Sequence, residues 1–191
     1  MSGLREKTDF KKDLVTYGPI GERRLMEILS ARGRRHEDIS DIEEFRIFDI
    51  DIIQYNDDVC TWKMVLDAYY HGKYASDVNA VAYEVKTDTY GVKSRNIVYE
   101  VISNSNSGCL ARTKADYLFY VFLNKENEII EEFLIDIKKL RWWIMENFDK
   151  VNNCDYLKSK SMRRGKDNTG IFLINIDYLV ANKSDIAKKL K

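Results

Sequence analysis

Short runs of β-branched and aromatic residues alternate with polar segments along most of the chain. Such runs predict strands at residues 46–55, 81–87, 96–103, 117–123, 129–135 and 171–176. Apolar residues at spacings of three and four predict helices at residues 21–32, about 61–70, 108–115 and 137–148, with a charged helix after the last strand. Asp136 is suited to cap the helix that ends near residue 148. This order predicts a mixed α/β sheet rather than a helical bundle or a β-sandwich.

Ionisable residues cluster on the first two predicted strands. Glu84 and Lys86 are two residues apart, so they project from one face of their strand while Val85 projects from the other. Asp49 and Asp51 likewise share a face of the preceding strand. Neighbouring carboxylates suit a hard divalent cation such as Mg²⁺, and an adjacent lysine can orient or deprotonate a water molecule. The two strands together therefore predict a metal site.

The same residues belong to longer motifs along the chain. These are residues 9–14 (DFKKDL), 48–50 (FDI), 84–88 (EVKTD), 96–100 (NIVYE), 113–117 (TKADY) and 169–174 (TGIFLI). In these motifs the chain resembles the PD-(D/E)XK nuclease superfamily, and within it small phage-type and resolvase-like endonucleases. The resemblance implies a single domain over residues 1–191, with a restriction-endonuclease-like mixed central sheet flanked by helices. It also implies hydrolysis of phosphodiester bonds in DNA with the help of Mg²⁺ or Mn²⁺.

The resemblance assigns roles to the residues of the central strands. Asp49 and Glu84 would bind the divalent cation, with the carbonyl of Val85 as a third ligand. Lys86 would position the water that attacks the phosphodiester. Asp51 is the second choice for the motif aspartate and a further candidate metal ligand.

Further roles are implied outside the central strands. Glu22 points with the apolar stripe of its predicted helix. By resemblance it would enter the site to hold a water or a second ion. Glu100 and Lys114 would line the rim of the same site.

The spacing between Asp49 and Glu84 departs from the family pattern. Asp49 precedes Glu84 by 35 residues, a much longer separation than the tight hairpin of the family. Either residues 56–79 form an insertion between the two strands, or Asp77 is the motif aspartate. Asp77 leaves too little chain for a strand and a turn before the strand that begins at residue 81, so we favour Asp49 and an insertion.

The charge balance bears on how nucleic acid would bind. The chain carries 31 basic and 31 acidic residues, so nucleic acid would have to bind a local patch. One predicted basic loop offers such a patch through Lys158, Lys160, Arg163, Arg164 and Lys166. Two histidines and three widely spaced cysteines argue against a histidine-rich metal site, a zinc site or a disulfide framework.

These features together predict a metal-dependent endodeoxyribonuclease. Two alternatives stay open, namely a catalytically decayed nucleic-acid-binding or protein-interaction module of the same fold, and an RNA endonuclease. The absence of a long apolar run argues against a membrane partner, and the cysteine usage favours the cytoplasm, that of the host cell if the protein is viral. A homodimer is a further possibility by analogy with resolvase-like proteins.

Overall fold

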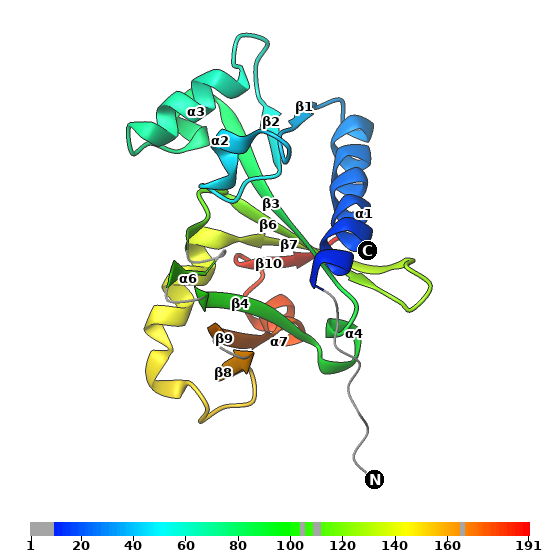
Figure 1. Cartoon of the computed structure of the whole chain (residues 1–191), viewed down its shortest axis with the longest axis vertical. Coiled ribbons are helices and arrows are strands. Elements are labelled where there is room, and N and C mark those ends of the chain that lie inside the picture. The colour runs from blue at the N-terminus through cyan, green and yellow to red at the C-terminus, as the bar shows by residue number, and fades with distance from the viewer. Residues whose placement is uncertain (1–9, 104–105, 109–111, 165–166) are drawn as a thin grey trace.

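The first of two sheets is mixed and six-stranded. The computed structural model in Figure 1 describes residues 10–103, 106–108, 112–164 and 167–191. The strands of this sheet follow the order β1-β2-β3-β6-β7-β10, in which β3 and β6 run parallel and all other neighbours antiparallel. They are β1 (Arg35–Asp38), β2 (Ile52–Tyr55), β3 (Ala80–Asp88), β6 (Tyr117–Leu123), β7 (Ile129–Asp136) and β10 (Ala187–Lys189). The predicted mixed α/β sheet is therefore confirmed.

The second sheet is antiparallel and has the order β5-β4-β9-β8. Its strands are β4 (Asn96–Ser103), β5 (Asn106–Ser107), β8 (Leu157–Arg164) and β9 (Asp167–Asn175). The helices are α1 (Phe10–Ala31), α2 (Glu43–Arg46), α3 (Trp62–Tyr70), η1 (Ala75–Val78), α4 (Gly91–Ser94), α6 (Ile137–Glu146), η2 (Phe148–Lys150) and α7 (Ile176–Asn182). None of the described helices combines the length and the apolar character that a membrane span requires.

The two faces of the six-stranded sheet pack against different partners. On one face, Leu25 and Leu29 of α1 join Val85 and Phe119 in one apolar cluster. The side chains of the other face pack with the second sheet and with α6 and α7 in a larger cluster. Figure 1 shows α1 on the opposite side of the six-stranded sheet from β4, β8 and β9. Alternation along β3 thus turns Glu84 away from α1 and into the layer between the sheets.

A helical insertion separates the paired strands β2 and β3. Residues 56–79 connect the two strands and contain α3 and η1. The strands themselves pair antiparallel from Ile52 opposite Tyr83 to Tyr55 opposite Ala80. The helix predicted near residues 61–70 is confirmed. In Figure 1 this insertion lies at the end of the sheet farthest from β8 and β9.

The strand predicted at residues 46–55 is wrong over its first half. Residues 43–46 form α2, and turn hydrogen bonds run from Phe48 N to Phe45 O and from Asp49 N to Arg46 O. Asp49 has a φ of 47°, which no strand residue adopts. β2 therefore begins only at Ile52, and Asp49 and Asp51 do not lie together on a strand.

Three further predictions along the chain need correction or fall partly outside the structure. The basic segment predicted as a loop forms strand β8 as far as Arg164, at the edge of the second sheet. Lysines on edge strands commonly prevent pairing with strands of other molecules. Lys166 lies outside the described residues. So do residues 109–111 of the helix predicted at 108–115, and residues 113–115 of it are not helical. The C-terminal helix is short and is followed by β10.

Candidate functional site

An ion pair on β3 forms the centre of the candidate site. Lys86 Nζ lies 2.7 Å from Glu84 Oε1, which confirms that the two side chains project together. The Glu84 side chain is only 2% exposed, whereas that of Lys86 is 38% exposed. Among the described residues, Glu84 Oε2 has no hydrogen-bond partner. A buried carboxylate oxygen without a partner is costly, so a further positive or donating group beside Glu84 Oε2 would stabilise the site.

Asp51 lies beside this pair. Its backbone N–H donates to Tyr83 O at 2.9 Å, and its Oδ2 accepts a hydrogen bond from Val85 N at 2.7 Å. These contacts hold its carboxylate at the edge of β3, next to Glu84. Burial raises the pKa of both carboxylates, and Lys86 lies close enough to oppose that rise.

The shortness of β2 exposes the backbone of β3 at this point. The ladder between the strands ends with Ile52 opposite Tyr83, so Val85 has no ladder partner on that edge. The N–H and C=O of one strand residue point to the same edge. The Val85 N–H faces Asp51. The Val85 carbonyl therefore points to the same edge of β3 as Asp51, as a third ligand would require.

Burial dominates the electrostatics of the two acidic side chains. It raises the pKa of Glu84 to about 7, with Lys86 opposing the rise and Asp51 adding to it. It also raises the pKa of Asp51, against the opposing effect of Lys86 and the Val85 N–H. Two crowded carboxylates that resist ionisation form an environment in which a cation would be stabilised.

Glu22 approaches the group from α1. Its neighbour Gly21 packs directly on β3, where an added Cβ would lie 2.8 Å from side-chain atoms of both Val85 and Thr87. Burial is the first cause that raises the pKa of Glu22, to about 7. Nearby carboxylates are the next cause, and they belong to Asp51, Asp38 and Asp41. Glu22 thus belongs to the same acidic group, as its place on the apolar face of the helix indicated.

Asp49 points elsewhere. Its two carboxylate oxygens accept hydrogen bonds from Arg112, Nε at 2.7 Å and Nη2 at 2.8 Å, and its carbonyl accepts one from Thr113 Oγ1 at 2.7 Å. Its charge still contributes to the raised pKa values of Asp51 and Glu84. The structure therefore brings Asp51, rather than the favoured Asp49, into contact with the β3 backbone beside Glu84. The third candidate, Asp77, caps η1 by accepting from Tyr74 N at 2.8 Å.

The two candidates for the rim lie on different elements. Glu100 is on β4 in the second sheet, where Gly108 packs against it so closely that a Cβ would lie 2.4 Å from the Glu100 carbonyl. Lys114 lies near the 56–79 segment, with its Nζ 5.2 Å from the centre of the Tyr74 ring.

The four predicted nucleic-acid-binding residues that the structure describes lie on a different sheet from Glu84. Lys158 and Lys160 are on β8, and Lys158 Nζ is 3.4 Å from Asp155. Arg163 and Arg164 belong to the same strand by their backbone pairing with β9.

Sequence reasoning missed three residues near the site. Arg112 anchors Asp49, and Asp38 and Asp41 add negative charge near Glu22. Each acts across a long sequence separation, so no local pattern pointed to them. The cluster at residues 37–41, with three acids in five positions, was the one available signal.

The described residues contain no group of three His, Cys, Asp or Glu side chains arranged to hold a metal ion. Asp51 and Glu84 supply two carboxylates, and a complete ligand set would need the Val85 carbonyl and water.

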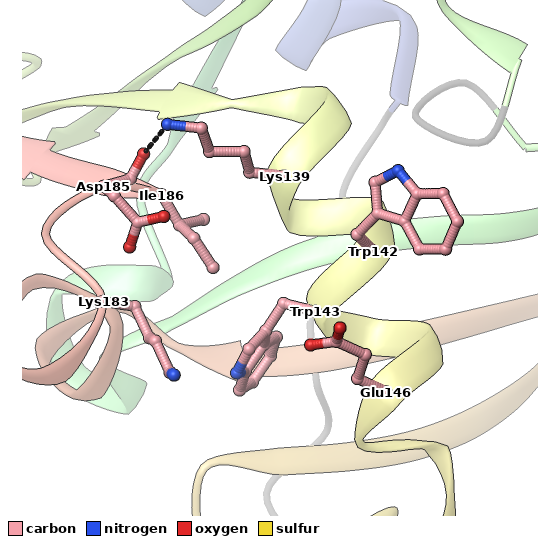
Figure 2. A pocket seen from close by; sticks show the side chains of 7 residues that line it. All are labelled: Lys139, Trp142, Trp143, Glu146, Lys183, Asp185 and Ile186. Carbon is pink, nitrogen blue, oxygen red and sulfur yellow. Dashed lines mark hydrogen bonds between the residues drawn. The ribbon is translucent and has the colours of Figure 1, made fainter.

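A cavity of about 210 Å³ between α6 and the segment after α7 is separate from this group (Figure 2). Its lining includes Trp142, Trp143 and Lys139. Lys139 Nζ donates to the carbonyl of Asp185 at 3.0 Å.

No family model, curated protein or solved structure matches this chain.

Proposed function

We propose that this protein is a divalent-metal-dependent nuclease that hydrolyses phosphodiester bonds in DNA. The observation that carries the proposal is the buried Glu84 carboxylate, with one oxygen paired to Lys86 and the other without a hydrogen-bond partner among the described residues, beside Asp51. A purely structural ion pair would not need a second buried acid at its side. The arrangement therefore favours a site that binds a cation.

The donor set fits Mg²⁺ or Mn²⁺. Both ions prefer oxygen ligands, and Mg²⁺ keeps several waters in its coordination sphere. Asp51, Glu84 and the Val85 carbonyl would supply three oxygens on one side, which leaves the remaining positions to water and a phosphate oxygen. A bound cation would polarise the phosphate and offset the charge that develops in an in-line displacement.

The chain's own residues would handle the water. Lys86 is partly exposed, so its ammonium can hold a water molecule against the phosphate while it stays paired with Glu84. Glu22, with a pKa of about 7, can accept a proton near neutral pH. Its position on α1 would let it orient a water from the side opposite Glu84.

The fold supports the proposal in a second way. Asp116, in the TKADY motif, receives the Ala82 N–H on its Oδ2 at 2.9 Å and donates its own N–H to Ala82 O at 2.9 Å. These bonds join the TKADY motif to β3 two residues before Glu84, beside the point where the parallel pair β3 and β6 begins. We infer a restriction-endonuclease-like arrangement on this basis.

One observation favours a decayed, non-catalytic module instead. Lys86 and the Val85 N–H each already satisfy one carboxylate oxygen without a metal. A protein that kept the pair only for stability would have the same contacts. Such a module would bind nucleic acid without cutting it.

A cleavage assay separates these functions. Wild-type protein with Mg²⁺ or Mn²⁺ would be compared with Asp51→Asn and Lys86→Met on single-stranded, duplex and branched DNA, with RNA as the substrate control. We expect each variant to lose about 100-fold or more in rate, because both groups act on the reacting atoms. Glu146→Gln, an exposed change on α6, is the matched control.

Each outcome has a defined meaning. Asp49→Asn is run in the same assay, and cutting that is lost in Asp49→Asn but kept in Asp51→Asn would return the metal role to Asp49. Preferential cutting of RNA would make the protein a ribonuclease. Binding without any cutting would favour the decayed module.

A further inference from the structure

The 56–79 segment presents exposed aromatic rings and lysines together. Tyr70 is 60% exposed and Tyr74 is 44% exposed, while their neighbour Tyr69 is buried in the core. Lys73 is exposed between them in the chain, and Lys114 holds its Nζ 5.2 Å from the centre of the Tyr74 ring. We call Tyr70, Tyr74, Lys73 and Lys114 the tyrosine–lysine patch.

The patch contacts Phe48, three residues before Asp51 of the candidate site. The Tyr70 ring packs edge-on against Phe48, with centroids 5.6 Å apart, and Phe48 O accepts the Lys114 N–H at 2.9 Å. Phe48 is followed by Asp49 and, two residues later, by Asp51. The Tyr70 ring therefore packs on the segment that precedes Asp51 in the chain.

We propose that this patch binds an unpaired stretch of nucleic acid and leads it to Glu84 and Lys86. The proposal rests on the proposed nuclease function and adds to it the class of substrate, a single strand or an unpaired end. Exposed aromatic rings stack on bases of any sequence, and lysines contact the phosphates between them. Duplex DNA hides its base faces, so it could use the lysines but not the rings.

The composition of the patch favours nucleic acid over a protein partner. Lysines are depleted in protein–protein interfaces, whereas here they alternate with the rings. The lysine over the Tyr74 ring places a cation beside a flat aromatic face, the pairing that a phosphate and its base would meet. Residues 56–79 hold four aspartates and two lysines, so the positive charge that a phosphate would meet in the patch comes from Lys73 and Lys114 themselves.

The test measures binding separately from cutting. Fluorescence anisotropy in EDTA would compare labelled oligothymidylate, oligouridylate and a blunt duplex of equal length. The variants are Tyr70→Ala, Tyr74→Ala and their combination. Tyr70→Phe and Tyr74→Phe keep the rings, and Tyr90→Ala removes a ring that is 68% exposed on another part of the surface. Thermal unfolding would show that each variant is folded.

We expect each alanine variant to weaken single-strand binding by about fivefold to 100-fold. Duplex binding should change less than about twofold, because its bases are already stacked and hidden. The phenylalanine variants and Tyr90→Ala should bind as wild type does. The oligouridylate arm tells whether the unpaired strand is RNA as well as DNA.

Several results would overturn the proposal. They are wild-type protein that fails to bind single strands, alanine variants that bind them normally, and equal losses for single strands and duplex. Cleavage that depends on Asp51 and Lys86 but ignores the tyrosines would refute this inference alone. Ring-dependent binding without metal-dependent cleavage would refute the nuclease proposal and leave this one standing.

Discussion

Replacing Glu84 by glutamine tests the electrostatics of the site without any assumption about substrate. The substitution removes a buried negative charge and nearly preserves the side-chain volume. Burial raises the pKa of Glu84 from its ordinary 4.5 to about 7. The folded protein therefore holds this proton more tightly than the unfolded chain, and stability falls as the pH rises from about 4.5 to about 7. At 1.36 kcal/mol for each pKa unit, the loss in free energy of unfolding is about 3 kcal/mol.

The assay is thermal unfolding in EDTA at about pH 5 and about pH 8, on either side of the folded pKa. At the higher pH we expect Glu84→Gln to be more stable than wild type by about 1–3 kcal/mol, because wild type then carries the buried charge. For a chain of this length each kcal/mol corresponds to about 2–4 °C in Tm. At the lower pH the difference should nearly vanish. Glu146→Gln, on the surface of α6, should match wild type at both pH values.

Divalent metal should reverse the order of the two proteins. A ligand present at about 100 times its Kd adds about 2.7 kcal/mol to the free energy of unfolding. Mg²⁺ or Mn²⁺ at about pH 8 should therefore raise the Tm of wild type and leave that of Glu84→Gln nearly unchanged. The reasoning is refuted if Glu84→Gln is less stable than wild type at the higher pH, or if both proteins have the same pH dependence. Either result would mean that Lys86 keeps Glu84 comfortably ionised, as a structural ion pair.

Two further predictions concern charges away from the site. Arg24 Nε donates to Glu132 Oε1 at 2.6 Å, and Glu132 is almost fully buried, so Arg24→Met should cost about 3 kcal/mol in urea unfolding. Unchanged stability would show that the buried Glu132 does not depend on Arg24 as its partner. Lys160→Glu on β8 should weaken duplex DNA binding and lower its dependence on salt, as measured by anisotropy. Unaltered binding would mean that the lysines of this outer strand serve only to keep other strands away.

Local patterns were sufficient wherever the determinants lie close together in the chain. β6 is buried on both faces and β7 is buried over part of its length, so an apolar run is sufficient to predict each strand from the sequence. Asp136 caps α6 by accepting from Lys139 N at 2.9 Å, as its position before an apolar pattern indicated. The pairing of Glu84 with Lys86 follows from the two-residue repeat of a strand, so it too was visible in the sequence.

Long-range contacts explain the failures. The segment before β2 has the composition of a strand, but Asp49 is fixed in a left-handed conformation by Arg112, 63 residues further along the chain. The choice between Asp49 and Asp51 depends on where β2 begins, which no local pattern determines. The polar β8 was misread because its strand character comes from pairing with β9, not from its own side chains.

The four-residue length of β2 has a consequence for how the proposed metal site could be lost. The apolar pattern of residues 46–55 suits a longer strand, so local preference and the observed turn oppose each other here. If Asp49 were freed from Arg112, two more residues could join the ladder and pair with the N–H and C=O of Val85. The unpaired edge of β3 beside Glu84 would then be covered by a longer β2, which would satisfy the hydrogen bonds of the Val85 backbone. The proposed site would then be lost through additional regular structure and not through unfolding.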